Sequence, residues 1–386
     1  MRRFSPPVWF SLALCLASIN FLSNTAVETS NVYMALYARS IGSSNMQVGF
    51  IAAAMGIALL VSALVFGRLS DIHGRVNFIR VGLALTSLSF FFQALAHNPW
   101  TLLAARGFVG FCGGINTAVI MAYTYEHQKQ IGNFISYGAL GWLVGAMLAA
   151  LVKVYTSLFI ASAAISFVSF LISFMLKEDK NTAARIQVAA FPIHLLKSDF
   201  RIFLGFFLRQ LGGMGIWTVW PLYLSSIGAS KFWISVMDAT NMLGQFIASR
   251  YIERFNPTRM FQFGLIVSVI VFALYGVANH YLEIIPVQML LSVGYSAMFI
   301  GALNYLLKRH RERGTIAGLL NSTMSFAGSI GPFLGGAISQ VWGYGAVMFF
   351  GSGVSLLAYI SARGLARDKK TETPAIISDT RYSSGE

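Results

Sequence analysis

Ionisable and amide side chains that recur at helical spacing inside long apolar segments are the residues of this sequence that could do chemistry. Asn20, Asn24, Glu28 and Asn31 follow one another at steps of four, four and three, which places them on one face of a helix. Arg106 interrupts another apolar segment. Polar groups in such surroundings are costly unless they are paired or line a cavity, so they indicate a functional site.

Glu28 and Arg106 are the pair that could carry a proton. Glu28 would lie about nine residues from the outer end of its helix, and Arg106 about seven residues from the outer end of its own. At about 1.5 Å per residue, their depths in the membrane agree within about one helical turn. Burial disfavours the charged carboxylate, whereas a nearby cation favours it. A change in that balance would load or release a proton. The alternative is a fixed structural ion pair.

A similar set of side chains occurs later in the chain. Asp238, Asn241 and Gln245 stand at i, i+3 and i+7 on one helical face, and Arg209 and Gln210 lie in the preceding apolar segment. The depths of Arg209 and Asp238 differ, so we expect a shared cavity rather than a salt bridge. Asp238 is the third candidate for proton coupling, and the alternative is a solvated position near the mouth of the cavity. The other polar residues of both sets are candidates for the wall of a substrate cavity.

The composition shows which elements must position these side chains. Of 386 residues, 56% are hydrophobic and 11% are charged, whereas soluble domains carry about 25% charged residues. Such a chain needs lipid as its solvent, and in lipid only helices or closed barrels satisfy every backbone polar group. The apolar runs are about twenty residues long, which is the length of a spanning helix rather than of a barrel strand.

Twelve apolar runs are present, and they predict an all-α membrane protein with twelve transmembrane helices. They lie at about 8–37, 46–66, 77–96, 100–122, 132–152, 155–176, 200–225, 232–250, 259–278, 283–306, 315–340 and 344–364. We expect a first six-helix half at 1–176, a cytoplasmic linker at 177–198, a second six-helix half at 199–366 and a disordered cytoplasmic tail at 367–386. Trp217 and Trp220, near the end of the seventh run, would belong to an aromatic belt at the membrane surface.

The basic residues predict the orientation. With the N-terminus in the cytoplasm, 23 of the 28 Lys and Arg residues fall in cytoplasmic segments, and the opposite side holds only Arg39, Lys153 and Lys231. Arg106 and Arg209 fall inside spans. Positive charge gathers on the cytoplasmic side of membrane proteins, so both termini are expected in the cytoplasm. The expected location of the protein is the cell membrane. The net charge of +14 therefore does not indicate nucleic-acid binding.

The chain also repeats itself. Residues 36–44 match residues 222–230 at an offset of 186, and a set of small residues recurs at an offset of 190: Gly138, Gly141 and Gly145 return as Gly328, Gly331 and Gly335. Six spans per repeat is an even number, so the halves are parallel and related by an axis along the membrane normal. The small residues, with Pro332 as a kink, predict close helix packing.

The segment Gly67-Arg68-Leu69-Ser70-Asp71-Ile72-His73-Gly74-Arg75 resembles the signature of the major facilitator superfamily, with Val76 in place of a second basic residue. Gly74 is expected to adopt a positive φ in a tight turn. The resemblance implies a cytoplasmic gate that joins the halves in the outward-open state, formed by Gly67, Asp71, Gly74, Arg75 and, in a degenerate second copy, Glu253. It also implies a role in proton transfer for Arg106.

The exporters of that superfamily have Gly-Pro-x-x-Gly-Gly in the fifth span. Here the pattern is complete only in the eleventh span, and Trp142 replaces the proline in the fifth. The function expected from the resemblance is secondary transport by alternating access, with proton-coupled antiport of a small organic solute. The alternatives are a symporter or uniporter for a sugar, organic acid or other metabolite, a multi-span membrane enzyme and a receptor.

No nucleotide-binding loop, metal-ligand cluster or hydrolase motif is found in the sequence. The expected protein is therefore not an enzyme and has no cofactor, with protons as the coupling ion. Its expected partners are the lipid bilayer and a small-molecule substrate, without nucleic acid, and the expected state is a monomer.

Overall fold

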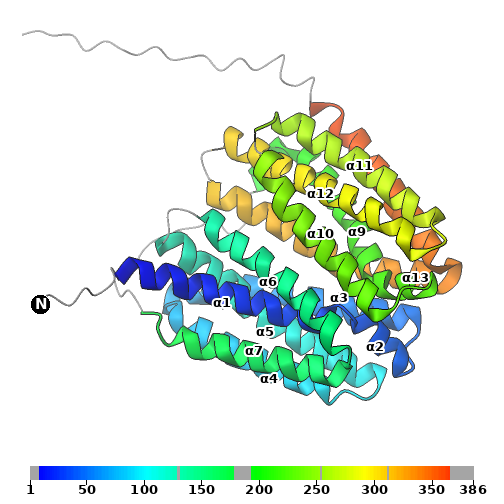
Figure 1. The fold of residues 1–386 in the computed structure, drawn as a ribbon. Coiled ribbons are helices and arrows are strands. Elements are labelled where there is room, and N and C mark those ends of the chain that lie inside the picture. The colour runs from blue at the N-terminus through cyan, green and yellow to red at the C-terminus, as the bar shows by residue number, and fades with distance from the viewer. Residues whose placement is uncertain (1–7, 128–130, 178–192, 253, 311–312, 366–386) are drawn as a thin grey trace, which may run out of the picture.

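The computed structural model describes residues 8–127, 131–177, 193–252, 254–310 and 313–365 (Figure 1). Every regular element in these ranges is a helix. The helices are α1 (Val8–Asn31), α2 (Met34–Ser40), α3 (Asn45–His73), α4 (Val76–Ala94), α5 (Pro99–His127), α6 (Ile131–Val152), α7 (Tyr155–Ser173), α8 (Ile193–Ser198), α9 (Phe200–Ser226), α10 (Lys231–Ile252), α11 (Pro257–Val277), α12 (Tyr281–Arg309) and α13 (Arg313–Ala362). Most of the predicted linker and the whole predicted tail lie outside the described residues.

The long helices correspond to the twelve predicted spans. Eight helical stretches in the described part of the chain are long and apolar enough to cross a membrane. Helix α13 contains the eleventh and twelfth spans, which meet at Gly343 with a φ of 80°. The predicted fold, with twelve membrane-spanning helices in two halves, is therefore confirmed.

The first span differs from the prediction of one helix over 8–37, because the chain turns at Val32 and Tyr33 between α1 and α2. The Tyr33 hydroxyl lies 3.2 Å from the carbonyl oxygen of Ala149 and 2.6 Å from the hydroxyl of Ser235. Contacts with two other helices thus hold the chain at the turn, and no local sequence signal reports them.

The two halves repeat one packing scheme, and in Figure 1 they lie one above the other. In the first half α1 packs on α6, α3 on α5 and α4 on α7, and in the second half α9 packs on α13, α10 on α12 and α11 on α13. The halves meet along two helix pairs, α3 with α13 and α6 with α10. Helix α3 corresponds to α10 in the other repeat, and α6 corresponds to the first part of α13. Each of the two pairs is therefore the counterpart of the other, as expected for parallel repeats.

The turns after α2 and α9 show the repeat at atomic detail. Gly42 and Gly228 both have a φ of 89°. The amides that follow them, of Ser43 and Ala229, each donate to the carbonyl five residues back at 2.9 Å. This is the hydrogen-bond pattern of a glycine-terminated helix. Both turns lie at one end of the bundle, here named the Gly42 end, and Gly74 marks the opposite end, the Gly74 end.

The hydrophobic core joins the halves at the Gly42 end. One cluster of buried residues there contains Tyr33 and Ala146 from the first half and Ile234 and Met237 from α10. Two further clusters each stay within one half. The core therefore holds the halves together near the Gly42 end.

Candidate functional site

The polar face of α1 lies against α6. The Asn20 amide donates to the carbonyl of Phe134 at 2.6 Å, and the Asn24 amide donates to the side-chain oxygen of Asn20 at 2.9 Å. The indole N–H of Trp142 donates to the side-chain oxygen of Asn24 at 2.7 Å. The structure therefore places Asn20 and Asn24 in a hydrogen-bonded contact between two helices, and the residue that replaces the family's proline takes part in it.

The small residues of α6 allow this close approach. A Cβ atom on Gly145 would lie 2.7 Å from the Cβ of Glu28, and one on Gly138 would lie 2.8 Å from the Asn20 amide nitrogen. Gly141 faces the backbone of α1 in the same way, at the carbonyl of Phe21. A larger side chain at Gly141 or Gly145 would push α1 away from α6, and one at Gly138 would displace the Asn20 side chain.

The corresponding residues of α13 contact both halves. A Cβ atom on Gly331 would lie 2.8 Å from the Cβ of Met214, and one on Gly335 would lie 2.7 Å from the Cα of Gly215, both on α9. The carbonyl of Pro332 instead faces Gly49 of α3, in the other half. The helix therefore has one glycine face toward its own half and another toward the opposite half.

Arg106 is buried, but it does not form an ion pair with Glu28. Its terminal Nη2 donates to the side-chain oxygen of Asn31 at 2.8 Å and also contacts the sulfur of Met55. Its Nε and Nη1 atoms are buried without a hydrogen-bond partner. The direct Glu28–Arg106 contact expected from the depths of the two residues is thus not observed in this conformation. Asn31, one turn beyond Glu28 on the same face, takes its place.

Glu28 is buried instead near the contact between the two halves. It is 5% exposed and lies within electrostatic range of Asp238, which is 8% exposed. Asp238 accepts a hydrogen bond from the indole N–H of Trp220 at 3.0 Å. Within the described part of the chain no hydrogen bond is made to the Glu28 carboxylate. One buried carboxylate from each half therefore lies at the contact between them.

A hydrogen bond between the halves lies next to these carboxylates. The Tyr33 hydroxyl is 2.6 Å from the Ser235 hydroxyl and donates to the carbonyl of Lys231 at 2.6 Å. Glu28 is five residues before Tyr33, and Asp238 is three residues after Ser235 on the same face of α10. The positions of the carboxylates thus follow from this contact.

The hydrogen bonds between the halves gather at the Gly42 end. The backbone amide of Asn45 donates to the side-chain oxygen of Gln340, in the second half, at 2.9 Å, and the Asn45 side chain donates to the carbonyl of Ser339 at 3.3 Å. Among residues that the structure describes, every hydrogen bond between the halves lies at this end. The bundle is therefore closed at the Gly42 end.

Arg209 is held inside the second half and not by Asp238. Its Nε donates to the Ser268 hydroxyl at 3.0 Å, and its Nη1 donates to the side-chain oxygen of Gln210 at 2.7 Å. The guanidinium also lies over the rings of Phe272 and Tyr295, 5.2 Å and 5.1 Å from their centres. These contacts satisfy the charge locally, as a cation held by aromatic faces.

The polar face of α10 turns toward α12 beyond Asp238. The Gln245 amide donates to the side-chain oxygen of Asn241 at 2.6 Å, and the Asn241 amide lies 3.4 Å from the carbonyl of Gln288. Asn241 is buried and Gln245 is half-buried. The two amides form a chain of hydrogen bonds that begins one turn from the Asp238 carboxylate.

The loop that resembles the family signature lies at the Gly74 end. Gly74 has a φ of 89°, as predicted for its turn. The Ser70 hydroxyl donates to the carbonyl of Gly67 within α3, and Arg75 precedes α4 as its N-cap residue. The side chain of Asp71 and the whole of Glu253 lie outside the described residues.

The sequence did not single out several residues of this site. Trp220 was expected in an aromatic belt, but it is 1% exposed and donates to Asp238. Tyr33 and Ser235 carry no motif that would identify them. The one signal in the sequence was Lys231, which the predicted orientation places on the side of the membrane with few basic residues.

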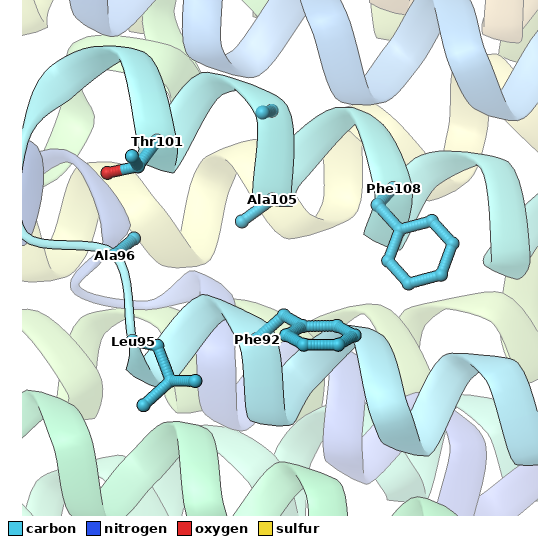
Figure 2. A pocket seen from close by; sticks show the side chains of 7 residues that line it. Phe92, Leu95, Ala96, Thr101, Ala105 and Phe108 are labelled. Atoms are coloured by element: carbon cyan, nitrogen blue, oxygen red, sulfur yellow. The ribbon is translucent and has the colours of Figure 1, made fainter.

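A separate hollow opens on the outer surface of the first half, between α4 and α5 (Figure 2). Its volume is about 320 Å³, and its lining is Phe92, Leu95, Ala96, Thr101, Ala104, Ala105 and Phe108. The Thr101 hydroxyl is bonded to its own helix turn at Asn98. The hollow thus offers apolar surface without a charged group. Among described residues, no three His, Cys, Asp or Glu side chains gather to hold a metal.

Comparison with known families gives matches over nearly the whole chain. The Major Facilitator Superfamily model matches residues 16–201 and residues 202–381. Quinolone resistance protein NorA of Staphylococcus aureus (strain MSSA476) is 25% identical over 347 residues, which cover 84% of this chain and 89% of that protein. Tetracycline resistance protein, class B, of Escherichia coli is 26% identical over 315 residues, which cover 74% of this chain and 77% of that protein.

Solved structures share the fold. The crystal structure of nucleoside transporter NupG superposes with a TM-score of 0.76 at 13% identity, covering 92% of this chain and 99% of that chain. A bacterial homolog to the human lysosomal transporter Spinster, in an inward-facing and unoccupied conformation, gives a TM-score of 0.76 at 15% identity, covering 96% of this chain and 100% of that chain. At these identities the likeness concerns the arrangement of helices alone.

Proposed function

The chain belongs to the major facilitator superfamily, and on that premise we propose that this membrane transporter is a proton-coupled antiporter that expels small organic compounds from the cytoplasm. Alternating access around a cavity between the two halves is the general mechanism of transporters built from such repeats.

The observation that carries the coupling is the pair of buried carboxylates, Glu28 from the first half and Asp238 from the second. Two carboxylates that share a desolvated site are not both ionised at low cost. With the Gly42 end closed, a proton on one of them, or a positively charged group on the cargo, relieves the repulsion. When the halves separate at that end, both carboxylates are free to ionise. Proton and cargo therefore compete for one site, as antiport requires.

The conformation fits this scheme. With the Gly42 end on the outside, as the distribution of basic residues predicts, closure there corresponds to a state that is not open to the outside. The Gly67–Arg75 loop would join the halves at the opposite end in the outward-open state. Arg106, with two nitrogens lacking a partner, is available to pair with Glu28 once Asp238 moves away.

The direction of transport rests on the relatives. Proteins named for quinolone resistance and tetracycline resistance match this chain over most of its length. Resistance to a compound that acts inside the cell is consistent with export. The two buried carboxylates favour cargo that carries a positive charge, and the neighbouring indole of Trp220 adds an aromatic surface.

The test uses purified protein in proteoliposomes with a quinolone, a tetracycline and a lipophilic cation as candidate cargo. An antiporter concentrates its cargo inside when the lumen is more acidic than the medium, whereas a symporter does so when the medium is more acidic. Glu28→Gln should abolish concentration but retain exchange of labelled for unlabelled cargo. Glu283→Gln, a matched change of an exposed carboxylate, should behave as the wild type. Concentration driven by an acidic medium, or normal concentration by Glu28→Gln, would overturn the proposal.

A further inference from the structure

The ammonium group of Lys231, from the second half, lies against aromatic side chains of the first half. Its Nζ lies 3.8 Å from the centre of the Tyr155 ring and 5.8 Å from that of the Tyr33 ring. It also donates to the carbonyl of Lys153 at 2.9 Å. Two aromatic faces and a carbonyl acceptor are the groups that recognise an ammonium ion in protein sites. These three groups are named here the ammonium cage.

The backbone of the cage has an uncommon conformation. Lys153 is the one non-glycine residue in the described ranges with a positive φ, 57°. The offset of 190 aligns it with Gly343, which also has a positive φ, 80°. A lysine thus occupies a turn where the other repeat has glycine, and its carbonyl accepts Lys231. Strained residues of this kind persist where the surrounding structure over-determines them, often at functional sites.

The side chain of Lys153 also reaches across the contact. Its Nζ lies 5.6 Å from the centre of the Phe232 ring, in the second half. Lys153 and Lys231 are two of only three basic residues on the side of the membrane that such residues avoid. Each lies over an aromatic ring of the opposite half, so their charges are used at the contact between the halves.

We propose that the ammonium cage is a binding site for primary alkylammonium groups, which Lys231 fills as a tethered ligand and so keeps the Gly42 end closed. The proposal rests on the alternating access described above but not on the identity of the cargo or of the coupling ion. Lys231 must leave the cage before the Gly42 end opens. Free alkylammonium ions should bind there when the tether is absent.

The experiment measures the separation of the halves directly. Ser40 and Ser226 are exposed, lie at the Gly42 end and occupy equivalent positions in the two repeats. Nitroxide labels on Cys at both positions, with the buried Cys15 and Cys112 replaced by Ala, report their distance by double electron–electron resonance in proteoliposomes. Lys231→Ala should lower the ratio of closed to open molecules about tenfold, since a cation–π contact and a hydrogen bond between the halves are lost.

Chemical rescue separates a binding site from a general loss of packing. Adding n-propylammonium replaces the atoms that Lys231→Ala removes, so it should restore the short distance, and the neutral 1-propanol should not. Lys231→Ala with Tyr155→Leu should lack this rescue. Arg39→Ala removes an exposed charge at the same end whose side chain bonds only within its own turn, at Ser43, and should leave the distance unchanged.

Two results would overturn the proposal: an unchanged distance in Lys231→Ala, or equal rescue by propylammonium with and without the Tyr155 ring. Failure of the proposed antiport would appear differently, as missing pH-driven flux in a protein whose distances still respond to Lys231.

Discussion

Gly336→Ala should open the Gly42 end without weakening either half. Helices α3 and α13 touch there through their backbones, because a Cβ atom on Gly336 would lie 2.7 Å from the Cα of Gly49 and 2.7 Å from the carbonyl oxygen of Asn45. Backbone atoms cannot rotate away as a side chain would, so the helices must separate. Overpacking of this kind costs about 1–3 kcal/mol.

This cost applies only while the halves are closed at that end. The gain in helix propensity from Gly to Ala is the same in the closed and open states and cancels. The ratio of closed to open molecules should therefore fall about 5- to 150-fold. The label pair at positions 40 and 226 measures that ratio as the fraction of short distances.

Two other glycines of α13 supply the controls. Gly335→Ala would clash with Gly215 inside the second half, so it should lower the midpoint of thermal unfolding and leave the distance ratio unchanged. Gly353→Ala has open space around it, so it should leave the distance ratio unchanged and should not lower the thermal midpoint, because alanine has the higher helix propensity. A wild-type distance distribution in Gly336→Ala would refute the view that the α3–α13 contact belongs to one conformation only.

Two further predictions concern stability. Trp142→Phe removes the N–H that Asn24 accepts and should cost about 1 kcal/mol of unfolding free energy, seen as a lower thermal midpoint in detergent, whereas the exposed Trp100→Phe should have no effect. Gly42→Ala and Gly228→Ala meet no close neighbour but force alanine into a positive φ, so each should cost about 1–3 kcal/mol. Clearly unequal losses at the two glycines would contradict the structural equivalence of the repeated turns.

The fold was predictable because its determinants are local or periodic. Apolar length set the number of spans, and the match between residues 36–44 and 222–230 predicted a repeat, which the structure shows as equivalent turns at Gly42 and Gly228. The positive φ of Gly74 followed from residue type in the same way. Each of these signals depends on a few consecutive residues.

The partner of Glu28 was not predictable in the same way. Depth along a helix follows from counting residues, and by that measure Glu28 and Arg106 are level. The direction in which each side chain points also depends on the rotation of both helices within the bundle, which the packing of α1 on α6 sets. With that rotation Asn31 contacts Arg106, and Glu28 lies within electrostatic range of Asp238 instead.

The carboxylates break the internal repeat, whereas the packing residues keep it. The offset of 186 aligns Glu28 with Met214 and Asp238 with Ala52, so each of these two carboxylates lacks an acidic counterpart in the other half. The helix-packing glycines of α6, in contrast, have counterparts in α13. A fold that is stable with Met or Ala at the equivalent positions does not itself require a buried charge, and a buried charge is costly to keep. Glu28→Gln should therefore retain or raise the thermal midpoint while it removes the response to a pH gradient, which a purely structural carboxylate would not do.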